Sequence, residues 1–148
     1  MEHERGPHWY EVIGAFIINF GAIETCSYQW ILKLGGKTAL NNSIGPLLGQ
    51  RIKLLLELIS KSSLSPEQKK HFSALWIEIS ELAKTRNVIA HGPLVSHNKA
   101  GKMQMGILDF KQMKNAGPNP PFTPLLFKDI LRAGSRTAKI LEEIVEPP

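Results

Sequence analysis

Residues 65–92, SPEQKKHFSALWIEISELAKTRNVIAHG, contain the start, the apolar face and the end of one long helix. Ser65 is a suitable N-cap, Pro66 fits the first helical position, and Gln68 can complete a capping box with Ser65. Apolar residues then recur at the three- and four-residue steps of a helix that packs on one side. They are Phe72, Leu75, Trp76, Ile79, Leu82, Ala83, Ile89 and Ala90. The glycine and proline that follow stop the pattern, so we expect the helix to end at about His91.

The same helical period occurs in three other parts of the chain. It predicts a first helix over residues 9–34, ended by two glycines, and then a loop over 37–46. It predicts a second helix over about 47–60 and a last helix over about 123–145. With the helix described above, this makes four.

The segment between the third and the last helix lacks this period. Residues 94–96 and 103–110 flank a turn at 98–101, so we expect a small hairpin or an irregular excursion here, followed by a loop at 117–121. The expected fold class is all-α, an antiparallel four-helix, up-and-down bundle with this insertion before the last helix. It would form one domain over residues 1–148.

Composition limits the class of protein further. The 148 residues are 43% hydrophobic and 21% charged, as in soluble globular domains. Cys26 is the only cysteine, which argues against a disulfide scaffold and a cysteine-based zinc site. The longest apolar run, 12–23, contains Asn19 and is followed by Glu24, so no membrane span is expected. The N-terminus lacks the basic region of an export signal, and we expect a cytoplasmic location.

Basic residues are concentrated in one part of the chain. The net charge is +5, but residues 1–83 contain 8 basic and 8 acidic residues, whereas residues 84–139 contain 10 basic and 2 acidic ones. Such clustering suggests an anionic partner such as nucleic acid. Solubility is an equally good explanation of the charge taken alone.

Two charged residues fall where the helical patterns require apolar ones. Glu24 lies on the apolar side of the first helix, and Arg86 lies on that of the third. Burial of either charge alone would cost several kcal/mol, so we expect the two to pair. A purely structural ion pair is the simplest explanation.

The end of the third helix, RNVIAHG over residues 86–92, combines side chains that suit a phosphate. Asn87 and His91 are four residues apart and share a face of the helix. The guanidinium of Arg86 can donate two hydrogen bonds to phosphate oxygens, and His91 can exchange a proton near neutral pH. The alternative for His91 is a helix cap stabilised by the helix dipole.

RNVIAHG resembles the signature of the HEPN superfamily (higher eukaryote and prokaryote nucleotide-binding domains), in which four to six residues separate an Arg from a His and a polar residue follows the Arg. The first-helix string NFGAIE, residues 19–24, is similar to the segment that supplies an inward Glu in several HEPN families. The resemblance implies a metal-independent endoribonuclease, acting as a toxin or in anti-phage defence. It also implies a homodimer whose two motifs face one cleft.

The same resemblance implies roles for individual residues. Arg86 would stabilise the scissile phosphate, His91 would act as general acid or base, Asn87 would orient them, and Glu24 would hold Arg86. Candidate RNA-binding residues are Lys84, Lys99 and Lys102. Pro93 stands where the subgroup paired with a nucleotidyltransferase antitoxin has Tyr, so modification of that Tyr is not implied for this chain.

Partners and cofactors follow from these hypotheses. RNA and a second copy of the chain are the expected partners, and a toxin would also have a cognate antitoxin or regulatory protein. No cofactor is expected, and His91 with His97 makes only a weak case for a metal. The aromatic residues of the first helix lie around more than one side of it and could supply the core or a dimer interface; they are Trp9, Phe16, Phe20, Tyr28 and Trp30. The alternative function is a catalytically inactive module of the same fold that binds RNA, a nucleotide or a protein.

Overall fold

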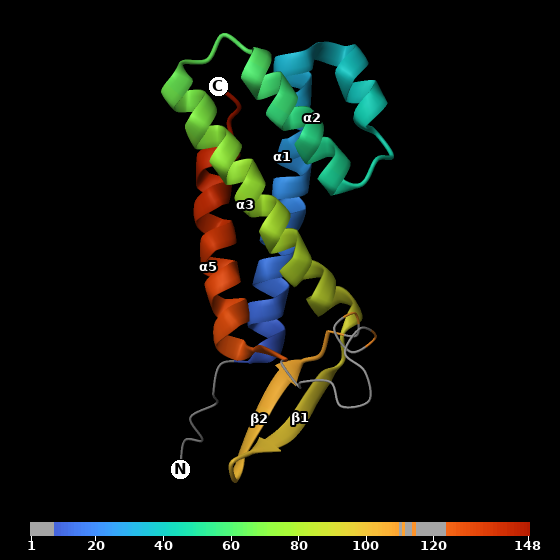
Figure 1. The fold of residues 1–148 in the computed structure, drawn as a ribbon, viewed down its shortest axis with the longest axis vertical. Helices are drawn as coiled ribbons and strands as arrows, with labels where there is room; N and C mark the ends of the chain where they lie inside the picture. The colour runs from blue at the N-terminus through green and yellow to red at the C-terminus, as the bar shows by residue number, and fades with distance from the viewer. Residues whose placement is uncertain (1–7, 110, 112–113, 115–123) are drawn as a thin grey trace.

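The computed structural model of the protein describes residues 8–109, 111, 114 and 124–148, except for the side chains of His97 and Lys99. The elements within these residues are α1 (Trp9–Ser43), α2 (Leu48–Lys61), α3 (Pro66–His91), β1 (Leu94–Lys99), β2 (Lys102–Ile107), β3 (Leu125–Leu126) and α5 (Phe127–Ile144) (Figure 1). This part of the chain is mostly helical, as the sequence predicts, and a small three-stranded sheet accompanies the helices. The predicted loop at 117–121 lies outside the described residues.

The helix α1 contains a kink at Gly36. The backbone there has φ 76° and ψ −176°, a left-handed conformation that glycine adopts without steric cost. Residues 37–43 continue beyond the kink as helix, so the prediction of a loop over 37–46 is wrong for most of its length. Gly36 does end the straight part of α1, but none of residues 37–43 prevents the chain from forming helix again.

The kink at Gly36 affects the direction of α2, which differs from the direction predicted for an up-and-down bundle. Near the start of α2, the Arg51 Nε donates a hydrogen bond to the Ser27 Oγ of α1, and further along α2 the Leu58 side chain packs against Gly35. The later residue of α2 contacts the later residue of α1, so α2 runs parallel to α1. The expected alternation of up and down is therefore wrong for this pair, because residues 37–47 carry the chain back before α2 begins. The helix α3 runs antiparallel to both α1 and α5 (Figure 1).

The core is built around Trp30, a fully buried residue of α1. Its ring meets the Trp76 ring of α3 edge to face, with 5.8 Å between ring centroids. Its Nε1 donates a 2.7 Å hydrogen bond to the carbonyl oxygen of Ile144, at the end of α5. One side chain of α1 thus joins the other two long helices.

The aromatic residues of α1 serve this core more than a surface. Phe16 and Phe20 are buried like Trp30, so of the two expected roles, core or dimer interface, these three rings take the core. The exposed large apolar side chains of α1 include instead Tyr10 and Ile18, which are 85% and 73% exposed.

The insertion begins with a β-hairpin. Of the two predicted alternatives, a small hairpin or an irregular excursion, the hairpin is therefore the one present. The strands β1 and β2 are antiparallel, with Lys99 opposite Lys102 at the turn. The strand β3 pairs with the end of β2, and α5 begins directly after it at Phe127. The last helix therefore starts later than the predicted residue 123. Figure 1 shows that the hairpin projects from the end of the molecule at which α3 ends and α5 begins.

Among the helices that the structure describes, none has both the length and the apolar character that a crossing of the bilayer requires.

Candidate functional site

The last two turns of α3 carry the RNVIAHG segment, and close backbone contacts determine where the helix ends. The N–H of Gly92 donates a 2.7 Å hydrogen bond to the Val88 carbonyl, and the N–H of Leu108 donates one of 3.1 Å to the Pro93 carbonyl. A Cβ atom on Gly92 would lie 2.2 Å from the Leu108 carbonyl oxygen. Glycine is required here because the chain after β2 passes against the end of α3.

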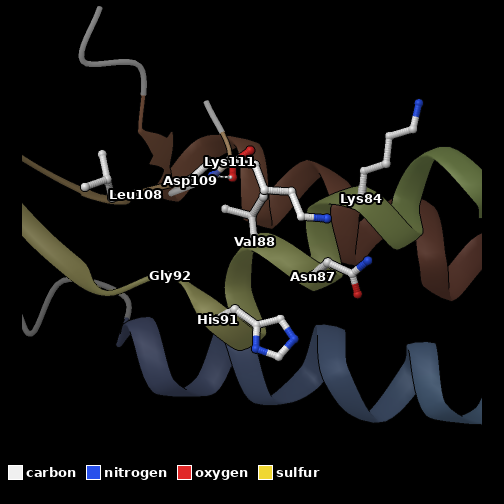
Figure 2. A pocket seen from close by; sticks show the side chains of 8 residues that line it. All are labelled: Lys84, Asn87, Val88, His91, Gly92, Leu108, Asp109 and Lys111. Carbon is white, nitrogen blue, oxygen red and sulfur yellow. Dashed lines mark hydrogen bonds between the residues drawn. The ribbon is translucent and has the colours of Figure 1, made fainter. Parts of the chain in front are cut away.

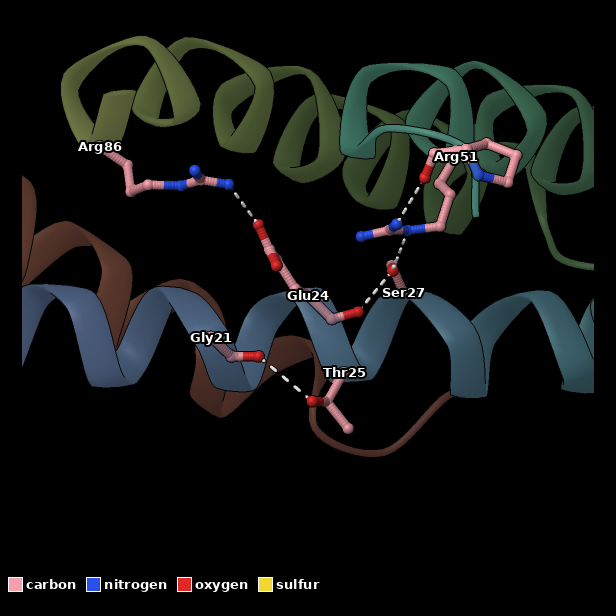
Figure 3. A network of polar contacts seen from close by, with 7 residues as sticks. Gly21, Glu24, Thr25, Ser27, Arg51 and Arg86 are labelled. Carbon is pink, nitrogen blue, oxygen red and sulfur yellow. Dashed lines mark hydrogen bonds and ion pairs between the residues drawn. The ribbon is translucent and has the colours of Figure 1, made fainter. Parts of the chain in front are cut away.

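Glu24 and Arg86 pair across the α1–α3 interface, as the sequence predicts. The Arg86 Nη2 lies 2.7 Å from the Glu24 Oε1, and the two side chains are 31% and 32% exposed (Figure 3). The guanidinium carbon of Arg86 also lies 5.5 Å from the centre of the buried Phe20 ring. Partial burial strengthens such a pair relative to one in water. The arginine is thus held in place while part of it stays open to solvent.

A cavity of about 520 Å³ lies beside the end of α3 (Figure 2). It is lined by Lys84, Asn87, Val88, His91, Gly92, Leu108, Asp109 and Lys111. The Asn87 and His91 side chains are exposed, so a ligand in the cavity can reach both. A histidine, an amide and two lysines line the cavity beside one carboxylate, that of Asp109, so the cavity combines a proton-transfer group with cations that suit an anionic ligand.

The structure divides the predicted catalytic residues into two sets. Asn87 and His91 line the cavity, whereas Arg86 points toward α1 and is absent from the described lining. An ideal helix places residues 86 and 91 about 140° apart, which accounts for this division. Glu24 belongs to the set with Arg86, so the described lining of the cavity includes neither member of the ion pair.

The predicted RNA-binding lysines are not gathered in one place. Lys84 lines the cavity, where its Nζ also lies 2.7 Å from the Glu81 carboxylate. Lys102 is exposed at the turn of the hairpin, opposite Lys99, whose side chain is outside the described atoms. Lys111 joins the cavity from the segment after β2, although the sequence did not single it out. Only tertiary packing brings it there, so no local pattern could have found it.

Sequence reasoning also missed a buried arginine of α2. Arg51 is 6% exposed and donates a 2.9 Å hydrogen bond from Nη1 to the Pro46 carbonyl (Figure 3). Its guanidinium carbon also lies 4.4 Å from the centre of the Tyr28 ring. Its Nε bonds to Ser27, whose hydroxyl donates to the backbone carbonyl of Glu24 at 2.5 Å. Arg51 therefore supports the segment of α1 that presents Glu24. The signal was available, because Arg51 lies on the apolar stripe of its helix, as Arg86 does.

The remaining candidate chemistry is accounted for by the core or lies outside the described atoms. Cys26 is buried, and burial raises the pKa of its thiol, as expected for a small core residue. In the described ranges, no three His, Cys, Asp or Glu side chains gather as metal ligands do. The His97 side chain, the weak partner of His91 in the metal hypothesis, is not described.

Comparisons with protein-family models, curated proteins and solved structures find no match to this chain.

Proposed function

We propose that the protein is a metal-independent endoribonuclease of the HEPN type, acting in the cytoplasm as a toxin or a component of anti-phage defence. The observation that carries the proposal is the cavity at the end of α3, where exposed His91 and Asn87 stand with Lys84 and Lys111. A chain that binds an RNA phosphate there would have a proton acceptor and positive charge at the same place.

The reaction would use the ribose 2′-hydroxyl as nucleophile. His91 would take the proton of the 2′-hydroxyl or give one to the departing 5′-oxygen, while the lysines would offset the charge that grows on the phosphate oxygens. The bond from phosphorus to the 5′-oxygen breaks as the bond to the 2′-oxygen forms. The products are a 2′,3′-cyclic phosphate and a 5′-hydroxyl end. The proposed step uses no metal-bound water, because the nucleophile belongs to the RNA itself.

These product ends test the reaction. We expect purified protein to cleave a structured RNA in the presence of EDTA and to leave 2′,3′-cyclic phosphate termini, which remain resistant to phosphatase until acid opens the ring. Cleavage that stops with EDTA, or that leaves 3′-hydroxyl ends, would contradict the proposed mechanism.

A homodimer would complete the site. One His91 cannot easily act on both sides of a phosphate, and Arg86 pairs with Glu24 and is not among the described lining of the cavity. Two copies related by a two-fold axis would supply two of each side chain to a shared cleft. Support comes from Ile17 and Ile18 of α1, which are exposed, and Ile17 is on the same helical side as Glu24, two turns away. Ile17 and Ile18 are consecutive, and together they would form the apolar part of a dimer contact.

Light scattering on a matched pair of variants tests the dimer. We expect Ile18→Asp to convert the protein to a monomer at tens of micromolar, because a carboxylate would be buried in an apolar contact. Leu47→Asp is the control, since Leu47 is similarly exposed at the start of α2 and should leave the dimer intact. A wild-type protein with the mass of one chain would refute the dimer.

The second candidate function is a catalytically inactive module that binds RNA, a nucleotide or a protein partner. The Glu24–Arg86 pair favours it, because an arginine held by a carboxylate within the same chain can be purely structural. The RNA-end experiment separates the two, since a binding module leaves the RNA intact.

A further inference from the structure

The helix α5 presents an open basic face that the proposed catalytic site does not use. Lys128, Arg132, Ser135 and Lys139 follow one another at four- and three-residue steps, and all four are exposed. They therefore lie along one side of the helix, opposite the side that enters the core. At 1.5 Å per residue, the three cations extend over roughly 16 Å.

Part of this face is hollowed. A shallow cavity of about 360 Å³ is lined by Leu131, Arg132, Ser135, Arg136 and Lys139. These are three cations, one hydroxyl and one apolar side chain, with no carboxylate among the described lining. The guanidinium groups of the two arginines, the ammonium group of Lys139 and the hydroxyl of Ser135 are all hydrogen-bond donors. The cavity therefore suits an anionic ligand that is rich in oxygen.

Within the described part of the chain, a carboxylate pairs with one of the three cations of the cavity and with neither of the other two. The Nε and Nη2 atoms of Arg136 lie 2.5 and 2.7 Å from the two carboxylate oxygens of Glu78 on α3. The Arg136 hydrogen bonds also lower the pKa of the Glu78 carboxyl, so the pair stays ionised at neutral pH. Neither Arg132 nor Lys139 takes part in an ion pair within the described part of the chain. Their charge is therefore available to a ligand.

We infer that the α5 face binds the phosphate backbone of an RNA strand, as a second contact separate from the cavity at His91. The line of cations is longer than one phosphate group and matches a chain of successive phosphates better than a small anion. Three of the five described lining residues of the cavity are cations and one, Leu131, is apolar, so this cavity suits a polyanion better than the apolar centre of a protein interface. The choice of RNA as the polyanion rests on the proposed function.

Binding measurements on a cleavage-deficient protein test this contact. In the His91→Ala background, a fluorescein-labelled single-stranded RNA of about 20 nucleotides is titrated at several salt concentrations. We expect Arg132→Gln with Lys139→Gln to reduce the slope of log K against log salt by about 1.4, since each lost contact on a single strand contributes about 0.7. At 0.1 M salt, this corresponds to about 25-fold weaker binding.

The matched control removes the same charge elsewhere. Lys33 and Lys53 are exposed on α1 and α2, and Lys33→Gln with Lys53→Gln should leave the affinity nearly unchanged. An equal loss in both double variants, or no loss in the α5 variant, would overturn the inference. A wild-type protein that does not cleave RNA would refute the proposed nuclease function. The α5 contact is tested separately, because it is measured as RNA binding and not as cleavage.

A cross-linking measurement locates the RNA independently. Because Cys26 is buried, a Ser135→Cys variant can be labelled selectively with a photoreactive group at the α5 face. We expect ultraviolet light to join this position to the RNA probe at low salt. A labelled protein that binds the probe without forming the cross-link would show that RNA lies elsewhere.

Discussion

His91→Ala is expected to lower the rate of RNA cleavage by about 10²–10⁴-fold, the contribution typical of a general acid or base. The side chain is exposed at the cavity and lies outside the core, so the variant should keep the wild-type unfolding temperature. Cleavage rates measured from 2′,3′-cyclic phosphate ends, together with thermal unfolding, test both parts of the expectation.

The matched control for this variant is another exposed histidine. His71 lies on α3, where its Nε2 is 2.7 Å from the Glu143 carboxylate. A surface pair of this kind contributes little stability, so His71→Ala should cleave RNA at the wild-type rate. Metal-independent cleavage that persists in His91→Ala would remove His91 from the mechanism, and an equal loss in both variants would point to a general effect of histidine removal.

Gly92→Ala is expected to lower the free energy of unfolding by about 3 kcal/mol, at the upper end for overpacked sites. The added Cβ would lie 2.2 Å from the Leu108 carbonyl oxygen and 2.7 Å from that of Val88, and both are backbone atoms that cannot rotate away. The end of α3 and the segment after β2 would have to separate. Urea unfolding followed by circular dichroism measures the loss.

Gly49→Ala provides the comparison. Gly49 lies in α2, and a Cβ there meets no atom within 4 Å. Because alanine restricts the unfolded chain and favours helix, this variant should gain up to about 1 kcal/mol. A Gly92→Ala protein as stable as the wild type would mean that the segment after β2 does not pass against α3 in solution.

The parts of the fold that the sequence predicted depend on local signals. Ser65 and Gln68 form the expected capping box, with the Gln68 N–H donating to the Ser65 hydroxyl at 3.2 Å. Glu24 and Arg86 were found because a charge on an apolar stripe requires a partner, and the pairing is confirmed. Such signals need only the residues of one helix.

The missed parts depend on contacts between distant residues or on a single torsion angle. The parallel course of α2 follows from the left-handed φ of Gly36 and the helical turn after it, and a pair of glycines does not specify that angle. Lys111 reaches the cavity only through the path of the chain after the hairpin. The absence of Arg86 from the described lining of the His91 cavity agrees with the 140° between the two residues on an ideal helix.

The hydrogen bond from Trp30 to Ile144 spans 114 residues and has a consequence for protein synthesis. The helix α5 is the last described element to leave the ribosome, so the side of α1 that packs against it stays uncovered until then. Chains fold from the N-terminus as they are made, and uncovered apolar surface is prone to aggregation. A transcript truncated before residue 127 would therefore encode an unstable, aggregation-prone polypeptide instead of a shortened but folded protein.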